Sequence, residues 1–132
     1  MAKKRTVRSI PQERTPVREL DPLERSANFE EVNCGYTETE AVLESQRCLF
    51  CPDPKCIAGC PVSINIPGFI ERIGERDFRG AYDIITGTNL LPAVCGRVCP
   101  QENQCEGVCV VGENLVPVAI GRMERFVGDL AI

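Results

Sequence analysis

Apolar side chains recur at helical spacing in the middle of the chain. One stripe follows the i, i+3, i+4, i+7 pattern of an amphipathic helix and consists of Ile66, Phe69, Ile70 and Ile73. A second helix is expected after residue 77, with an inward face formed by Phe78, Ala81, Tyr82 and Ile85. The pattern therefore predicts helices over 66–74 and 78–86.

Three further helices are indicated by the residues at their starts. An Asp-Pro pair fits an N-cap and first turn, a Thr followed three residues later by Glu fits a capping box, and a lone Pro can open a helix. These helices are expected from Asp21-Pro22 to near Asn28, from Thr37 to about Arg47, and from Pro117 to roughly Leu130. No alternating strand and no Asn-Gly or Asp-Gly hairpin is found, so a small all-α fold is predicted.

Cysteine-rich segments interrupt this helical pattern. Segment 48–61 is expected to be a ligand loop rather than a regular element, and segment 92–112 is again rich in Cys, Gly and Pro. The chain has nine cysteines among 132 residues and no histidine. The absence of His excludes a His-based metal site, a His general base and a Cys-His or Ser-His nucleophile pair. Any chemistry must therefore depend on cysteines, carboxylates and whatever the cysteines bind.

Eight of the cysteines form two groups of four. The groups read Cys48-x2-Cys51-x4-Cys56-x3-Cys60-Pro61 and Cys95-x3-Cys99-Pro100-x4-Cys105-x3-Cys109. Two zinc sites, two iron–sulfur clusters and disulfides are the candidate interpretations. Structural zinc prefers C-x2-4-C pairs, and only the first pair fits this well. The spacing favours iron–sulfur, because in bacterial ferredoxins three close cysteines bind one cluster and a fourth, before Pro, binds the other. The x4 gap nevertheless departs from a plain ferredoxin loop.

If the spacing works as in these ferredoxins, each cysteine group contributes one ligand to the cluster that the other group mainly binds. One cluster takes Cys48, Cys51, Cys56 and Cys109, and the other takes Cys60, Cys99 and Cys105. The second cluster needs one more ligand, for which Cys95 is the obvious candidate. Glu124 is a rival, because a carboxylate among the apolar residues of the last helix is costly unless paired or ligated. The pattern alone favours a Glu124 that lies at the edge of the stripe and reaches water or pairs with a nearby Arg.

Charge is distributed unevenly along the chain. Residues 1–18 carry six basic side chains against one Glu and contain two prolines, so they are expected to form a flexible basic arm before a helical domain over 19–132. The net charge of the whole chain is −4, which leaves the remainder near −9 and argues against nucleic acid as the main partner. No apolar run suits a signal peptide or a membrane span, so a cytoplasmic protein with reduced, metal-binding thiols and no membrane partner is expected.

The ordered motifs resemble the N-terminal two-cluster domain of the glutamate synthase small subunit. The same module begins the large subunit of NADH-dependent reduced ferredoxin:NADP oxidoreductase, and also dihydropyrimidine dehydrogenase. The segments that carry the resemblance are Cys48-Leu-Phe-Cys51, Cys56-Ile-Ala-Gly-Cys60-Pro61, Leu91-Pro92-Ala-Val-Cys95-Gly-Arg-Val-Cys99-Pro100-Gln-Glu, Cys105-Glu-Gly and Val118-Ala-Ile120-Gly121-Arg-Met-Glu124-Arg125-Phe126. The resemblance covers about residues 17–129.

This resemblance implies an α-helical ferredoxin-like domain organised around two 4Fe–4S clusters. Cluster one then takes Cys48, Cys51, Cys56 and Cys109, and cluster two takes Cys60, Cys99, Cys105 and Glu124. This assignment by resemblance reverses the interpretation of Glu124 that the residue pattern alone favours. It also leaves Cys95 without a ligand role, and Cys34 is interpreted as a packed or surface thiol. In the family the module precedes FAD- and NAD(P)-binding domains, whereas these residues contain no G-x-G-x-x-G turn.

An electron-transfer module is therefore the expected function. It would relay electrons between an FAD/NAD(P)H oxidoreductase domain or subunit and a second flavoprotein or ferredoxin-type redox partner. FAD and NAD(P)H would bind only to the partner, and the chain would be either an excised domain or a split subunit without a complete active site. Two alternatives stay open: a zinc-binding structural or interaction module, and an enzyme that binds substrate at the non-Cys corner of cluster two.

Overall fold

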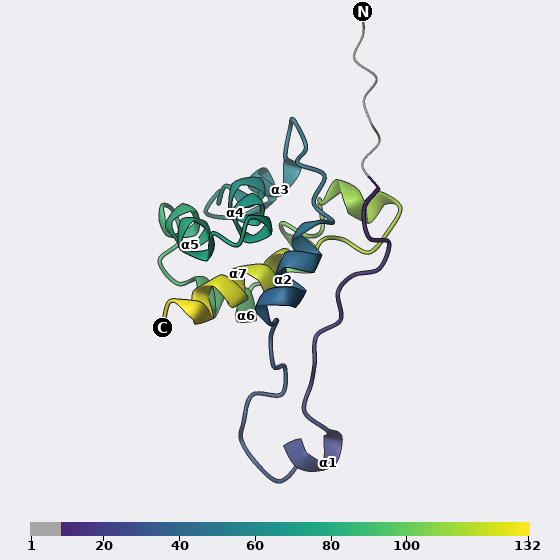
Figure 1. Ribbon diagram of the computed structural model, residues 1–132, viewed down its shortest axis with the longest axis vertical. Coiled ribbons are helices and arrows are strands. Elements are labelled where there is room, and N and C mark those ends of the chain that lie inside the picture. The colour runs from purple at the N-terminus through teal and green to yellow at the C-terminus, as the bar shows by residue number, and fades with distance from the viewer. Residues whose placement is uncertain (1–8) are drawn as a thin grey trace, which may run out of the picture.

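The computed structural model describes residues 9–132, and this part of the chain is helical (Figure 1). Its α-helices are α1 Pro22–Arg25, α2 Glu38–Ser45, α3 Lys55–Gly59, α4 Ile66–Gly74, α5 Phe78–Thr86, α6 Pro92–Val98 and α7 Ile120–Leu130, and its 3₁₀ helices are η1 Gln101–Asn103 and η2 Val110–Glu113. Within the described residues the only β-structure is an isolated antiparallel bridge, which confirms the all-α prediction. No helix of this range combines the length and apolar character that crossing a membrane requires.

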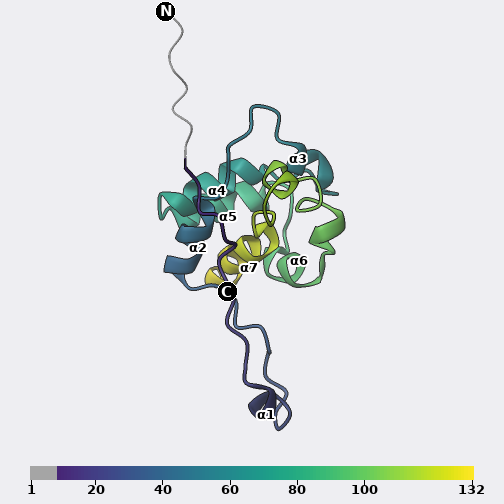
Figure 2. The ribbon, with the colours of Figure 1, turned by 90° about the vertical axis from the view of Figure 1, so that its right-hand side faces the viewer.

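Helix α7 is the centre of the fold. It packs against α2, α5 and α6, and both ribbon views place it among these helices (Figures 1 and 2). Its residues from Ile120 to Gly128 are buried except for Arg122, so the helix is covered on nearly all sides. The α4 stripe predicted from the sequence is also buried, with α4 packed on α5 and α2.

Two glycines let α6 and α7 approach closely. A Cβ atom on Gly96 would lie 2.6 Å from the backbone nitrogen of Arg125, and one on Gly128 would lie 2.4 Å from the backbone nitrogen of Ala93. Helix α6 was not predicted, because its contact with α7 is made through glycine and Pro92 instead of an apolar stripe. The helix matters for the site, since it carries Cys95 and is followed directly by Cys99.

Helix starts follow the capping signals in four cases. Thr37 and Glu40 form the predicted capping box of α2, and the side chains of Asp21, Asn65 and Asp77 accept backbone N–H groups at the starts of α1, α4 and α5. The predicted ends were less accurate, because α1 stops at Arg25 and α2 at Ser45. Segment 48–61 also differs from the prediction of a pure loop, since α3 lies within it.

The start of α7 corrects the sequence prediction by three residues. The helix begins at Ile120 and not at Pro117. Arg47 donates hydrogen bonds to the carbonyl oxygens of Val116 and Pro117, and Glu44 accepts the N–H of Ala119 at 2.9 Å. These contacts hold the segment before α7 in a non-helical conformation. They join residues far apart in the sequence, so a proline near the start of the helix could not reveal them.

The described part of the predicted basic arm lies against the helical body formed by α2–α7. The N–H of Thr15 donates to Glu44 Oε2 at 2.7 Å, and the Tyr36 hydroxyl donates to the Thr15 carbonyl at 2.6 Å. Thr15 is itself buried. Residues 1–8 lie outside the described residues, and the predicted domain boundary after residue 18 stays a prediction.

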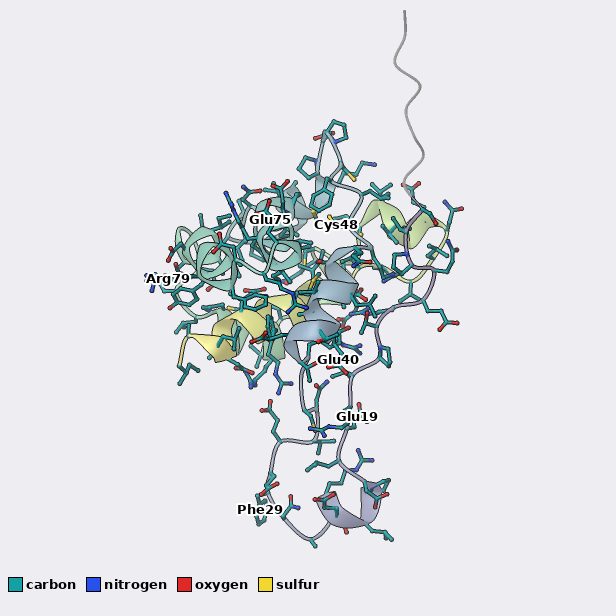
Figure 3. All side chains as sticks on the ribbon, viewed as in Figure 1. Glu19, Phe29, Glu40, Cys48, Glu75 and Arg79 are labelled. Atoms are coloured by element: carbon teal, nitrogen blue, oxygen red, sulfur yellow. The ribbon has the colours of Figure 1, made fainter. Side chains whose placement is uncertain are left out.

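Residues 18–34 leave the helical body as a hairpin (Figures 1 and 2). Its two sides are paired by hydrogen bonds of 2.9 Å between Leu20 and Val32 and between Cys34 and Arg18. Figure 3 shows Phe29 at the far end, away from the body, and this side chain is fully exposed. The hairpin therefore adds little to the core.

Candidate metal-cluster site

Four thiols meet in one narrow cavity of about 30 Å³. We call it the Cys48 cavity, and its thiols belong to Cys48, Cys51, Cys56 and Cys109. Figure 3 shows Cys48 inside the helical body. Most of the remaining wall is apolar and includes Ile66 and Ile70 of α4 together with Val111, Val118 and Ile120. The cavity thus combines soft sulfur donors with a mostly apolar lining.

A second cavity, of about 210 Å³, contains the other set of donors. We call it the Glu124 cavity, and it is lined by Cys60, Cys95, Cys99, Cys105 and Glu124. Asn89, Gln101 and Gln104 add polar groups to its wall. The structure thus brings together every residue that the resemblance assigns to cluster two, and adds Cys95 to them.

Each group of four cysteines contributes to both cavities. Cys56 lies in α3 and lines the Cys48 cavity, whereas Cys60 follows α3 and lines the Glu124 cavity. The second group divides in the same way at Cys105 and Cys109. Gly59 permits this arrangement, because its Cβ position is only 2.6 Å from Val108 Cγ2, so α3 packs directly on segment 104–108. Both cavities are therefore formed by the same two cysteine-containing segments of the chain.

Burial raises the pKa of several of these thiols. In the Cys48 cavity it is the main cause that raises the pKa of Cys48 and Cys56 to about 11, and the charges of neighbouring thiolates raise both further. Burial, followed by the nearby Glu106 carboxylate, raises the pKa of Cys105 to about 12. Thiols with such pKa values bind protons at neutral pH, so a metal that takes them as thiolates must release those protons.

Glu124 is the only buried carboxylate that lines either cavity within the described residues. It is 6% exposed, and burial raises its pKa to about 7 against the opposing effect of a hydrogen bond from Asn89. Asn89 Nδ2 donates to Glu124 Oε1 at 2.7 Å. The pattern-only interpretation of Glu124 is therefore wrong, since the carboxylate is removed from water and has no ion pair with an Arg of the described chain.

Asn89 is the residue of this site that the sequence analysis missed. It lies in the connection between α5 and α6 and is 8% exposed. Its local sequence contains no motif, and the only available signal was a polar residue in front of the apolar start of α6. Cys34, in contrast, lies where it was expected: it is partly buried and lines neither cavity.

The donor sets suit a multi-atom cluster. Within residues 9–132 no group of three or more Cys, Asp or Glu side chains forms a site for a single metal ion. The thiols instead stand around the walls of two cavities. A 4Fe–4S cluster takes four protein ligands spread over its corners, and each cavity offers at least four donors. By the number and type of their donors, the residues present therefore suit such a group in both places.

A small helical fold with two thiol-lined cavities defines a class of iron–sulfur cluster-binding domain. The chain belongs to the family described as dihydropyrimidine dehydrogenase domain II, 4Fe-4S cluster, whose model matches residues 25–132. That range contains all nine cysteines and Glu124. The match confirms the family resemblance and the assignment to 4Fe–4S-binding oxidoreductase domains.

Curated relatives agree with this family. The chain is 38% identical over 107 residues to the glutamate synthase [NADPH] small chain of Escherichia coli, which covers 81% of this chain and 23% of the relative. It is 40% identical over 101 residues to the E. coli NAD-dependent dihydropyrimidine dehydrogenase subunit PreT, with 76% and 24% covered. It is 37% identical over 110 residues to the E. coli putative oxidoreductase UacF, with 83% and 17% covered. The chain thus spans less than a quarter of each of these relatives.

Proposed function

We propose that this chain is an electron-transfer domain that carries two 4Fe–4S clusters. It relays electrons between an FAD/NAD(P)H oxidoreductase domain or subunit and a second redox partner. The observation that carries the proposal is the pair of cavities, each lined by at least four donors drawn from both cysteine groups. A bound cluster accepts and releases single electrons, whereas a reduced flavin holds two, so a pair of clusters suits a relay next to a flavin.

The ligands follow from the two linings and the resemblance. Cluster one takes Cys48, Cys51, Cys56 and Cys109, and cluster two takes Cys60, Cys99, Cys105 and Glu124. Cys95 is the rival fourth ligand of cluster two, because it lines the same cavity. Carboxylate oxygen is a harder ligand than thiolate, so cluster two is expected to differ from cluster one in reduction potential.

The chain's own residues hold and shield these sites. Buried apolar side chains of α4 form part of the wall of the Cys48 cavity, and Glu124 itself is buried in the wall of the other cavity. The close α6–α7 contact fixes Cys99 relative to Glu124. A fixed donor set limits the rearrangement that accompanies a change in charge.

The partner is expected to be a flavoprotein with a basic docking face. The names of two relatives, a glutamate synthase [NADPH] small chain and an NAD-dependent dihydropyrimidine dehydrogenase subunit, support NAD(P)H as the electron source on that partner. FAD and NAD(P)H would bind there and not on this chain. Residues 19–132 are acidic overall, and bound thiolate-ligated clusters add negative charge, so a basic partner surface is complementary.

Metal analysis tests the proposal against the zinc alternative. Protein purified without oxygen should be brown, absorb near 400 nm and contain about eight iron and eight acid-labile sulfide per chain. Stoichiometric zinc without sulfide would overturn the proposal in favour of a zinc-binding structural module. One cluster per chain would overturn the two-cluster relay.

Single substitutions then assign the ligands. Serine at Cys48, Cys51, Cys56 or Cys109 should damage cluster one first, and serine at Cys60, Cys99 or Cys105 should damage cluster two first. Glu124→Ala should leave cluster one unchanged and make cluster two labile, three-iron or shifted in potential. Cys34→Ala is the matched control, because this thiol lines neither cavity. Loss of a cluster in Cys95→Ala would move the fourth ligand from Glu124 to Cys95.

A further inference from the structure

Asn89 connects the two rival donors of the Glu124 cavity. Its Nδ2 donates a hydrogen bond to Glu124 Oε1 at 2.7 Å, and its Oδ1 accepts one from the Cys95 thiol at a distance of 3.6 Å. Asn89 is 8% exposed and Glu124 6% exposed. Because both side chains are nearly closed off from water, the hydrogen bond between them is costly to break.

The Asn89 amide has a single favourable orientation. The backbone N–H of Leu91 donates to Oδ1 at 3.0 Å. A 180° flip of the amide would turn its NH₂ group towards the Leu91 N–H and the Cys95 S–H, and its oxygen towards the Glu124 carboxylate. Donors would then face donors and acceptors would face each other. The start of α6 therefore determines that Nδ2 faces Glu124.

This orientation engages the two rival donors through opposite ends of one amide. The NH₂ group holds Glu124 Oε1, which as a carboxylate oxygen can only be held by a donor. The Oδ1 atom holds the Leu91 N–H and the Cys95 sulfur together. The same amide thus fixes the carboxylate and ties Cys95 to the start of α6.

We propose that Asn89 is a positioning residue that selects Glu124, and not Cys95, as the fourth ligand of the cluster bound in the Glu124 cavity. It acts by holding Oε1 of the carboxylate through Nδ2 and by holding the Cys95 sulfur through Oδ1. The inference rests on the proposed function, since it presupposes a cluster in this cavity. It also explains how Cys95 can line the cavity without being a ligand.

Two substitutions separate the functions of the amide. Asn89→Asp keeps an oxygen for the Leu91 N–H and the Cys95 S–H, but replaces the donor to Glu124 by a second carboxylate oxygen. Asn89→Ala removes the contacts to both rival donors. Asn114→Asp introduces the same charge at an exposed position that lines neither cavity, and it is the matched control.

The readouts are iron retention, cluster spectra and reduction potential, measured on protein with its full iron and sulfide content. In both Asn89 variants, cluster two should lose iron to a chelator with about 10- to 100-fold lower affinity, while cluster one is unchanged. Asn114→Asp should match the wild type in all three measurements. Where cluster two survives with four irons in an Asn89 variant, its spectrum and potential should change, because Cys95 releases its thiol proton to solvent and binds iron in place of Glu124.

A double variant checks the exchange of ligands. Asn89→Asp combined with Cys95→Ala should lose four-iron cluster two altogether, because neither rival donor is then available. The inference is overturned if both Asn89 variants keep the wild-type spectrum, potential and iron affinity of cluster two, or if Cys95→Ala alone removes that cluster. Wild-type protein that contains no iron and sulfide overturns the proposed function instead, so the two failures are distinguishable.

Discussion

Glu44 and Arg47 are the most deeply buried charged side chains of the described chain. They form an ion pair of 3.0 Å, and neither side chain has exposed surface. Glu44 also accepts the N–H groups of Thr15 and Ala119, and Arg47 donates to three backbone carbonyls that precede α1 and α7. The pair therefore joins α2 to two segments that are distant in the sequence.

Removing one partner of this pair should be strongly destabilising. Glu44→Gln leaves the Arg47 charge uncompensated in the interior, and we expect a loss of about 3–5 kcal/mol in the free energy of unfolding of the cluster-bound protein. Chemical denaturation measures this value. The exposed pair of Arg79 and Asp83 provides the control, because Asp83→Asn should cost less than about 1 kcal/mol. Equal losses for the two substitutions would contradict the structural role of Glu44.

Cluster retention should depend on pH through the buried thiols. Their raised pKa values, about 11 for Cys48 and Cys56 and about 12 for Cys105, mean that each thiolate released from iron takes up a proton at neutral pH. Falling pH therefore favours the metal-free form, by about tenfold per pH unit for each proton taken up. Iron loss to a chelator, followed by absorbance near 400 nm, should be faster at pH 6 than at pH 8. A rate that rises with pH would show that protons do not compete with iron.

Helices α6 and α7 form the element that positions the Glu124 cavity. Cys95 belongs to α6, Cys99 follows it, and Glu124 belongs to α7. Their close approach depends on two glycines that face the partner backbone. The hairpin over residues 18–34 is different, because α1 contains no buried residue and contributes to neither cavity.

Gly96→Ala should separate these two helices. The added methyl group would lie 2.6 Å from the Arg125 backbone nitrogen, closer than such atoms approach, so α6 must move. We expect a loss of about 1–3 kcal/mol in stability and selective loss of cluster two, both measured on reconstituted protein by denaturation and by iron content. Gly87→Ala is the control, since its Cβ would lie at an ordinary 3.4 Å from the nearest backbone oxygen. Damage to cluster one first would contradict this account of α6.

At the scale of the whole molecule, the two cysteine groups tie distant parts of the chain together. The Cys48 cavity draws on residues from 48 to 120, and the Glu124 cavity on residues from 60 to 124. A metal cluster bound by these thiols would join segments that are far apart in the sequence, and the metal-free protein lacks those links. Metal binding and folding are therefore expected to be coupled.

The metal-free protein should lose most of its cooperative unfolding. Removal of the clusters under anaerobic conditions, with a reductant to prevent disulfides, should replace a sharp thermal transition by a broad one. Circular dichroism and calorimetry measure the change, and reconstitution with iron and sulfide should restore the sharp transition. A metal-free form that melts as sharply as the cluster-bound protein would show that the helices need no metal.

The sequence by itself determined the local features of this protein. The α4 stripe and the capping residues of α1 and α2 were predicted because they depend on side chains a few positions apart. The spacing of the cysteines, with the family resemblance, also indicated an iron–sulfur domain, which the family match confirms. The assignment of each ligand stays a prediction.

Only the tertiary structure decided the rest, because it depends on contacts between residues far apart in the chain. Helix α6 forms against α7 through glycines that carry no apolar signal. The start of α7 is set by Glu44 and by Glu106, which accepts the N–H of Gly121. The burial of Glu124 and its hydrogen bond from Asn89 join positions 35 residues apart, and no local pattern encodes such a contact.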